Sequence, residues 1–236
     1  TRQTILNYIN NEINKKNRCL LDVLKHGVEF DNGVTLNLMY RKPANSFNPK
    51  AEALYQQNVF SVMEEVYHTE GERIDLVIFL NGIAIFTFEL KCNTSGQNYE
   101  DAIRQYKFDR DYKTRLLKFK AGCLAHFAMD LNEVYMCTNL KGASSFFLPF
   151  NKGCGTGINS GKGNPHNDNG INVSYMWEDI LKKDTVLYLI DKIIFLQKTT
   201  KKNPDTGKRE TKETLIFPRY HQLDVVTNLL ADVKEN

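Results

Sequence analysis

The stretch from Ile74 to Lys91 reads IDLVIFLNGIAIFTFELK. Two apolar runs rich in β-branched and aromatic residues flank Asn81-Gly82, the dipeptide that best tolerates the positive φ angles of a tight hairpin turn. We therefore predict two buried antiparallel strands. Three charged residues interrupt this apolar ribbon, namely Asp75, Glu89 and Lys91. Because buried charges are costly unless they pair with one another or bind a metal ion, the hairpin is the candidate site of the chain.

The register of this hairpin decides whether the three charges meet. Glu89 and Lys91 are two residues apart on one strand, so their side chains leave the same face. A strict two-residue turn at Asn81-Gly82 would instead set Asp75 opposite Phe88, on the other face from Glu89. Convergence of the three groups therefore requires a bulge or a wider loop that shifts the register by one residue.

Two carboxylates beside a lysine suit the hydrolysis of phosphodiesters. Oxygen ligands from Asp75, Glu89 and the Leu90 backbone carbonyl could hold a Mg²⁺ ion. Such an ion lowers the pKa of an attacking water and offsets charge in the transition state. Lys91 would orient or deprotonate that water, or stabilise negative charge. The lysine argues against a glycosidase, in which two carboxylates act alone.

The spacing of these residues also fits a second interpretation. An aspartate at a strand end and a solvated Glu-Lys pair at the mouth of a sheet would be inert, and many chains match so loose a pattern by chance. The whole block of Asp75, Asn81-Gly82 and Glu89-Leu90-Lys91 nevertheless resembles the PD-(D/E)xK nuclease motif as it occurs in the restriction (R) subunit of type I restriction-modification enzymes.

The resemblance extends over most of the chain from about Asn58 onward. Further stretches are similar to blocks of the same subunit, in the same order: Phe147 to Gly153, Gly163-Asn164-Pro165, Tyr175 to Glu178, and Phe217 to Gln222. The resemblance implies an α/β fold of the restriction-endonuclease type, with a mixed central sheet flanked by helices. It also implies a type I site-specific deoxyribonuclease, in which this part is a Mg²⁺-dependent DNA endonuclease domain.

Partners and cofactors follow from the same resemblance. The family works as a complex with methylation and specificity subunits, and its ATP-driven motor moves DNA. Target sequence belongs to the specificity subunit there, so we expect this domain to cut without sequence preference. ATP would serve the parent subunit and not this part of it alone.

Two glutamines match further motifs of the family. Type I nuclease domains carry Gln-x-x-x-Tyr on the helix after Glu-x-Lys, where the motif supports the active site or contacts DNA. Gln105 matches its first position, but Asp109 stands where the tyrosine is expected, and Tyr106 or Tyr112 could substitute for it. Gln222 matches the glutamine that reads an adenine base at the entry to the motor.

These matches predict the domain organisation. We expect an endonuclease domain with an N-terminal helical part over residues 1–198, a linker over 199–214, and the start of a helicase-like motor over 215–236. The segment 198–214 has almost no apolar residue and reads as a linker or a mobile hairpin. The chain ends before any Walker motif, so we expect a fragment that does not hydrolyse ATP by itself.

Composition sets wider bounds. The 236 residues are 42% hydrophobic, which is enough for one large domain. A net charge of +3 is only mildly basic, so DNA contacts must come from local clusters. Five cysteines are scattered without zinc-finger spacing, which predicts reduced thiols in a cytoplasm. Nothing in the sequence reads as a membrane span or a signal peptide.

Hydrophobic periodicity predicts the remaining elements. We expect helices over residues 4–17, 20–26, 49–57, 99–112 and 177–197, a strand over 133–138, and a long loop over 151–170. Residues 59–68 fit a strand, with a helix as the alternative; a strand would make a three-stranded meander around the site. The most basic segment before the tail is a plausible phosphate track or a solvated helix face: Arg104, Lys107, Arg110, Lys113, Arg115, Lys118 and Lys120.

Two rival functions stay open on the sequence. The first is a non-catalytic docking and DNA-binding module, in which the charged trio is a structural network and the N-terminal helices bind partner subunits. The second is a different PD-(D/E)xK nuclease. Convergence of Asp75, Glu89 and Lys91 favours catalysis, whereas their separation favours docking.

Overall fold

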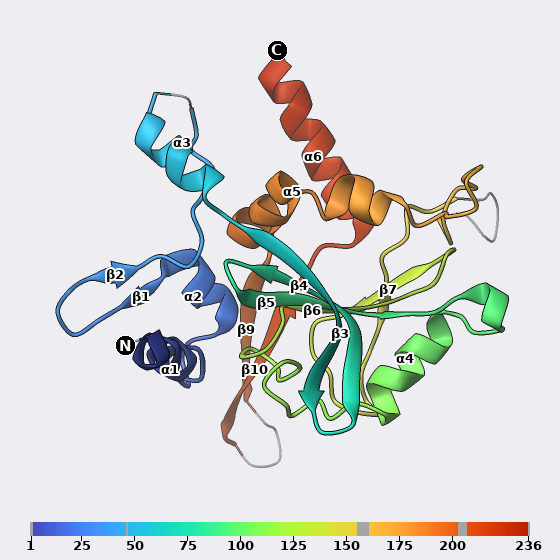
Figure 1. Cartoon of the computed structure of the whole chain (residues 1–236), viewed down its shortest axis with the longest axis horizontal. Helices are drawn as coiled ribbons and strands as arrows, with labels where there is room; N and C mark the ends of the chain where they lie inside the picture. Colours follow the sequence, from blue (N-terminus) through green and yellow to red (C-terminus); the bar gives the residue numbers. More distant parts are fainter. Residues whose placement is uncertain (1, 46, 155–160, 203–206, 236) are drawn as a thin grey trace.

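The central feature of the computed structural model is a six-stranded sheet, shown in Figure 1. The structure describes residues 2–45, 47–154, 161–202 and 207–235. The strand order is β3-β4-β5-β6-β7-β8. Neighbouring strands are antiparallel except β5 and β6, which are parallel. The bounds are β3 Phe60–Thr69, β4 Glu72–Leu80, β5 Ile83–Leu90, β6 Ala125–Met129, β7 Val134–Cys137 and β8 Leu148–Pro149. The predicted mixed sheet and the meander β3-β4-β5 are confirmed.

A helix and its flanking loops connect the parallel pair β5 and β6, because a tight turn cannot join parallel strands. The helix α4 spans Tyr99–Phe108 and begins with a capping box formed by Asn98 and Asp101. Its buried residues Ala102 and Tyr106 pack on Val77 of β4 and Ala128 of β6. The sheet therefore has one face covered by α4.

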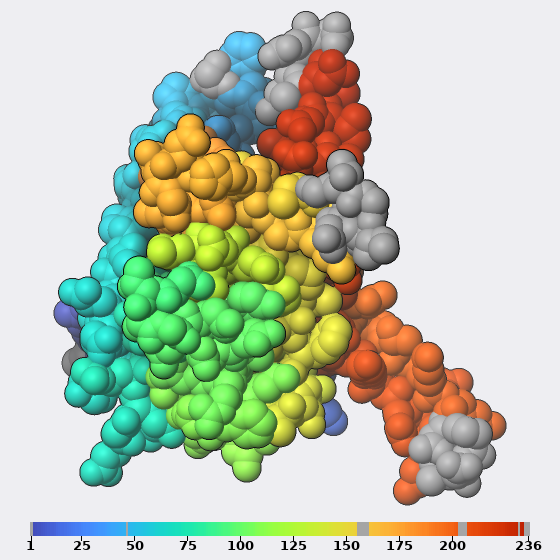
Figure 2. All heavy atoms as spheres, turned by 90° about the vertical axis from the view of Figure 1, so that its right-hand side faces the viewer, coloured from blue at the N-terminus to red at the C-terminus, as the bar shows by residue number. Residues whose placement is uncertain are grey.

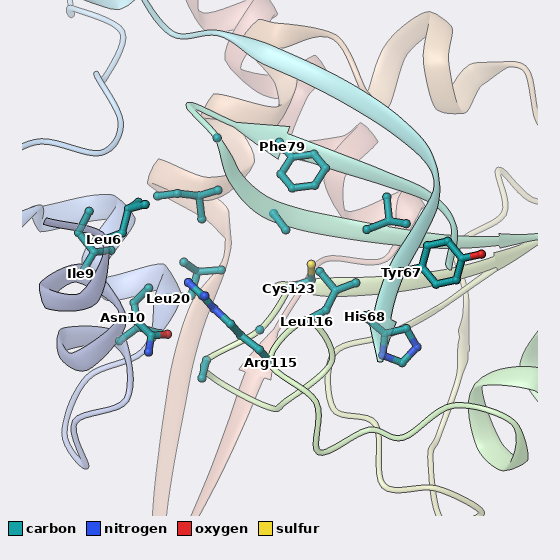
Figure 3. A pocket seen from close by; sticks show the side chains of 17 residues that line it. Leu6, Ile9, Asn10, Leu20, Tyr67, His68, Phe79, Arg115, Leu116 and Cys123 are labelled. Atoms are coloured by element: carbon teal, nitrogen blue, oxygen red, sulfur yellow. The ribbon is translucent and has the colours of Figure 1, made fainter. Parts of the chain in front are cut away.

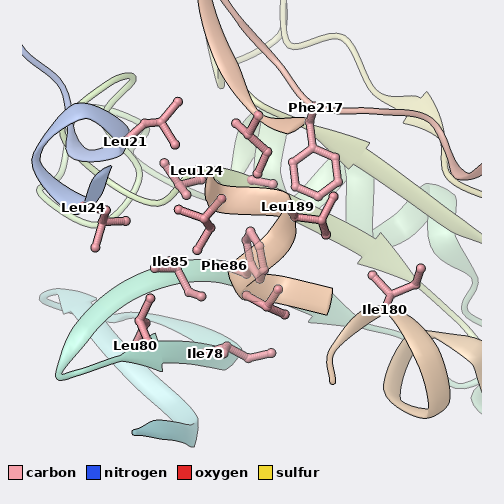
Figure 4. Close-up of a cluster of buried hydrophobic side chains, with 14 of the residues drawn as sticks. Leu21, Leu24, Ile78, Leu80, Ile85, Phe86, Leu124, Ile180, Leu189 and Phe217 are labelled. Carbon is pink, nitrogen blue, oxygen red and sulfur yellow. The ribbon is translucent and has the colours of Figure 1, made fainter. Parts of the chain in front are cut away.

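The other face carries the larger core. Residues from α2, from the C-terminal helical segment and from the end of the chain gather there over the strands, as Figure 4 shows for Leu21, Leu24, Ile78, Leu80, Ile85, Phe86, Leu124, Ile180, Leu189 and Phe217. The sheet is thus a layer between two apolar clusters.

The N-terminal elements follow the sequence signals closely. Helix α1 spans Arg2–Ile13, and α2 spans Leu20–His26 and ends at Gly27, whose φ of 70° suits glycine. Helix α3 spans Pro49–Gln56, with the Asn48 side chain accepting a hydrogen bond from the Ala51 amide at 3.0 Å. Two short strands, β1 Val28–Glu29 and β2 Thr35–Leu36, pair between α2 and α3.

Three predicted helices extend several residues beyond the helices of the structure. The helix predicted over residues 4–17 ends at Ile13. Helix α4 ends at Phe108 instead of residue 112. The Asp111 amide beyond it donates a hydrogen bond to the Glu72 side chain at 2.9 Å, so this amide is not part of the helix. A short 3₁₀ turn, η1 Asn93–Ser95, precedes α4. The helix predicted over 177–197 is broken into the π-helix η3 Met176–Ile180, α5 Lys183–Tyr188 and the π-helix η4 Leu189–Ile193.

The prediction of helix beyond Ile193 is wrong. Ile194 is extended, and Phe195 begins strand β9, which spans Phe195–Lys202 and pairs antiparallel with β10 Arg209–Ile216. Ladder pairing with β10 overrides the helical periodicity of these residues. Of the two alternatives for segment 198–214, its described residues adopt the hairpin, which projects from the body in Figure 2.

The end of the chain returns to the core. Helix α6 spans Tyr220–Glu235. Leu215 of β10, Phe217 of the connection and Leu223 of α6 are buried in the larger cluster. The domain boundaries at 198 and 215 stay predictions. In the predicted long loop, the described residues 151–154 and 161–170 contain one isolated bridge, between Cys154 and Lys162, and residues 155–160 lie outside the described part. None of the described helices has an apolar stretch that could cross a membrane.

A buried polar network fastens α4 to the sheet. The Thr87 hydroxyl of β5 lies 2.8 Å from the Tyr106 hydroxyl and 2.8 Å from Nδ1 of His126 on β6. Burial lowers the pKa of His126 to about 3. The imidazole is therefore neutral in the folded protein at all moderate pH values.

We expect Phe217→Ala to lower the free energy of unfolding by about 3–5 kcal/mol. The Phe217 ring makes edge contacts with Phe86, Phe127 and Phe150 at centroid distances of 6.0, 5.9 and 5.9 Å, so its removal leaves a cavity. Denaturant unfolding measures the change. Phe195→Ala, at a residue that is 50% exposed, is the matched control and should cost less than about 1 kcal/mol. Equal losses in the two variants would contradict the placement of Phe217 in the core.

We also expect His126 to make stability fall with acid. Its folded pKa lies below the unfolded value of 6.5, so the unfolded chain binds more protons between the two values and stability is lost as pH falls. The loss should reach about 2 kcal/mol between pH 6.5 and pH 5. His126→Gln should flatten the pH dependence of unfolding in this range, whereas His166→Gln, at an exposed histidine, should leave the slope unchanged. An unchanged slope in His126→Gln would refute this account.

Candidate active site

One extra residue in β5 sets the register of the central hairpin. Leu80 pairs with Ile83 and Phe79 with Ala84, but Ile78 pairs with Phe86, so Ile85 has no partner of its own. Beyond this bulge Leu76 pairs with Phe88, which sets Asp75 opposite Glu89. The predicted shift of the register by one residue is confirmed.

Asp75 bridges the two strands at the open end of the hairpin. Its Oδ2 accepts a hydrogen bond from the Leu90 amide at 2.7 Å, and the side chain is half-buried. Asp75 and Glu89 are close enough for the Asp75 charge to raise the pKa of Glu89. The two carboxylates are therefore neighbours on the α4 side of the sheet.

Glu89 is a carboxylate with no exposed surface. Its Oε1 accepts a hydrogen bond from Nε of Arg110 at 2.7 Å, while its Oε2 is buried without a hydrogen-bond partner among the described residues. Burial raises the pKa of Glu89 to about 8, against the opposing effect of the Arg110 hydrogen bond. The charge of Asp75 and a hydrogen bond between the two carboxyl groups raise this pKa further. A carboxylate oxygen of this kind is satisfied when it binds a cation.

Lys91 lies at the end of the same strand. Its backbone amide donates to the Met129 carbonyl at 2.9 Å, which extends the parallel ladder by one residue beyond β5. Alternation along the strand puts its side chain on the side of Glu89. No ion pair within 4.0 Å joins its amine to a carboxylate in the described part of the chain. The role of the Leu90 carbonyl as a metal ligand stays a prediction.

Gln105 lies on α4, which packs against β5 and β6. Its Oε1 is buried and has no hydrogen-bond partner in the described ranges. The Tyr106 hydroxyl is bonded to Thr87, and the Tyr112 ring lies beside the Lys113 amine. The hydroxyl of Tyr106 therefore serves the packing of α4, whatever the role of Gln105 is.

Arg110 is a site residue that no sequence motif marks. It belongs to the basic run predicted as a phosphate track or a solvated helix face, but its side chain is only 9% exposed and pairs with Glu89. Lys120 of the same run is bound to Glu213 at 2.7 Å. These two cations are therefore largely buried and paired with carboxylates, so the run is not a continuous track. No local sequence pattern predicts this ion pair, because Arg110 and Glu89 are 21 residues apart and the fold brings them together.

The residues present fit a magnesium ion. Asp75 and Glu89 supply two neighbouring carboxylates, and Mg²⁺ commonly takes one or two carboxylates together with water and substrate phosphate. Among the described residues no cluster of three or more His, Cys, Asp and Glu side chains is placed to hold a metal ion. Glu64 and Glu65 are exposed, in agreement with the expected solvent-facing pair, and Glu65 binds Arg73 at 2.9 Å.

The charged trio lies apart from an apolar cavity beside α1. Figure 3 shows this cavity, of about 380 Å³, between α1 and the sheet, where its walls include Leu6, Ile9, Leu20, Phe79 and Leu116. Asp75, Glu89 and Lys91 do not line it. The residues that line the cavity include no pair of carboxylates beside a lysine.

Gln222 lies at the start of α6. Its side-chain oxygen accepts a hydrogen bond from the Arg219 amide at 2.9 Å, and the residue is exposed. This contact closes the first turn of the helix. Its role in reading adenine stays a prediction.

Comparison with known proteins supports the resemblance found in the sequence. A protein of Methanocaldococcus jannaschii, provisionally named as the type I restriction enzyme MjaIXP endonuclease subunit, is 31% identical over 109 residues, which are 44% of this chain and 10% of that protein. The chain thus spans about a tenth of the length of this curated relative. The family described as "Type I restriction enzyme R protein N terminus" matches residues 2–145, which include the hairpin and α4. The chain therefore belongs to the family of type I restriction enzyme R protein N-terminal regions.

Proposed function

We propose that this region is the Mg²⁺-dependent DNA endonuclease domain of a type I restriction enzyme R subunit. The observation that carries the proposal is the bulge-shifted register, which sets Asp75 opposite Glu89. One buried oxygen of Glu89 accepts no hydrogen bond from the described residues. Membership in the family supports the restriction system and the endonuclease class.

Each residue of the trio has a separate task in this proposal. Asp75, Glu89 and the Leu90 carbonyl hold the ion, which when bound supplies an activated water and offsets charge on the phosphate. Lys91 orients or deprotonates the attacking water, or stabilises the charge that develops on the phosphate oxygens. Gln105 supports the site from α4 or contacts DNA. This assignment makes the domain a PD-(D/E)xK nuclease.

The rest of the complex follows from the family in the same way. DNA is the substrate, the methylation and specificity subunits are the partners, and a motor that uses ATP brings the DNA to the nuclease. Gln222 would read the adenine of that ATP. The setting is the cytoplasm, where the free thiols stay reduced.

A second function is favoured by the contacts of the carboxylates. Asp75 bonds to the Leu90 amide and Glu89 pairs with Arg110, as members of a purely structural network would do. The chain would then be a docking and DNA-binding module without chemistry. The close approach of Asp75 to Glu89 weighs against this function, because two neighbouring carboxylates repel each other unless a proton or a cation lies between them.

We expect Asp75→Asn and Lys91→Ala to reduce DNA cleavage by roughly 100-fold or more, because each removes a charge that acts on the reacting phosphate. Cleavage is measured in the complete complex with Mg²⁺ and ATP, and ATP hydrolysis is followed in the same samples. ATP hydrolysis should be unchanged, since the motor lies elsewhere.

Glu64→Gln is the matched control for these variants. Glu64 is an exposed carboxylate on the strand next to Asp75, so its loss should leave cleavage unchanged. Cleavage that survives both Asp75→Asn and Lys91→Ala would mean that the trio is structural and that the docking function is correct.

We further expect Mg²⁺ affinity to rise with pH up to about 8. Glu89 is protonated below its pKa of about 8, and a carboxylate must lose its proton to bind a metal ion. Affinity should therefore fall by up to about tenfold for each pH unit below this value. Calorimetry in two buffers of different ionisation enthalpy measures both the affinity and the proton released. Affinity that is independent of pH between 6 and 8 would exclude Glu89 as a ligand.

A further inference from the structure

We propose that Arg110 is a positioning residue of the metal site, which holds Glu89 by one carboxylate oxygen so that the other is presented to the ion. This inference rests on the proposed function, since it concerns the same carboxylate. It assigns a role to a residue outside the acid-and-lysine motif.

The two oxygens of Glu89 have different surroundings. Oε1 receives the Nε–H of Arg110 at 2.7 Å, and Oε2 is buried beside it without any hydrogen bond from the described residues. A carboxylate held at one oxygen cannot rotate freely about its last bond. The second oxygen therefore has a fixed direction, which is what a preorganised ligand requires.

The segment that carries Arg110 is itself tied down. On one side of Arg110, the Asp109 amide donates a hydrogen bond to the Gln105 carbonyl of α4 at 2.9 Å. On the other side, the Asp111 amide donates to Glu72 Oε2 at 2.9 Å. Glu72 begins β4, the strand that carries Asp75 three residues later. Arg110 thus lies between two anchors, one on α4 and one on the strand of the first carboxylate.

The burial of the Arg110 side chain argues for a positioning role and against a direct contact with DNA. The Arg110 side chain is 9% exposed and Glu89 is not exposed at all, so the pair is formed inside the protein. A guanidinium that already points inward is poorly placed to reach a phosphate on the surface. Residues that hydrogen-bond to a metal-binding side chain commonly fix its orientation, and their loss weakens metal binding.

The test is a titration of the full chain with Mn²⁺ alone, in which electron paramagnetic resonance measures the free ion and the signal of the bound ion. Arg110→Ala should bind Mn²⁺ about 10- to 100-fold more weakly than the unchanged protein at the same pH. Arg110→Lys should recover part of the affinity, because it keeps the charge and loses the fixed planar fork. Circular dichroism verifies that each variant is folded, and Arg110→Lys carries the test if Arg110→Ala is not.

Two further variants separate the possible failures. Arg104→Ala removes the same charge from an exposed position of α4 and should leave Mn²⁺ binding unchanged. Glu89→Gln should abolish binding if the proposed metal site is correct. Mn²⁺ binding that survives Glu89→Gln overturns the proposed function itself. The remaining outcome is that Glu89→Gln abolishes binding while Arg110→Ala binds Mn²⁺ as well as the unchanged protein or better. This result overturns only the role of Arg110, whose guanidinium would then compete with the ion for the Glu89 carboxylate.

Discussion

The register of one hairpin is the constraint on which the candidate site depends. Without the extra residue Ile85 in β5, Asp75 would face the larger apolar core opposite Phe88, and Glu89 would remain alone on the other side of the sheet. The bulge leaves Ile85 without a partner on β4, but its carbonyl accepts a hydrogen bond from the Leu124 amide at 2.8 Å. Its side chain is fully buried in the core, which stabilises the bulge further. A feature of the backbone thus decides where two charges meet.

Burial then gives the pair its chemistry. Glu89 lies between β4 and β6 with Ala128 as its neighbour across the parallel ladder, so little polar surface solvates the carboxylate. The neighbouring charge of Asp75 adds repulsion, and Arg110 opposes it. Such a carboxylate accepts a proton or a cation much more readily than an exposed one does. Helix α4 supports this environment, because the network of Thr87, Tyr106 and His126 fixes the helix on the sheet.

Sequence patterns predicted the parts of the fold that depend on local chemistry. The Asn81-Gly82 turn, the cap of α3 and the strands of the meander all have short-range signals, and the need for a register shift followed from the spacing of Asp75 and Glu89. Patterns did not predict the end of helix at Ile193 or the inward direction of Arg110. Both depend on partners distant in the sequence, β10 in the first case and Glu89 in the second. The periodicity of apolar residues in one segment carries no information about which distant segment it will contact.

The balance of charges around Glu89 bears on the choice between catalysis and docking. A buried ion pair is not needed for stability, since apolar residues of similar volume often serve as well or better. A network kept only for structure would therefore gain nothing from an unsatisfied oxygen beside a second carboxylate. Violations of local rules are expected where function requires them. Glu89 violates two such rules, because it is a buried acid and one of its oxygens receives no hydrogen bond from the part of the chain that the structure describes. Both violations occur where Asp75 lies opposite Glu89 across the bulged hairpin.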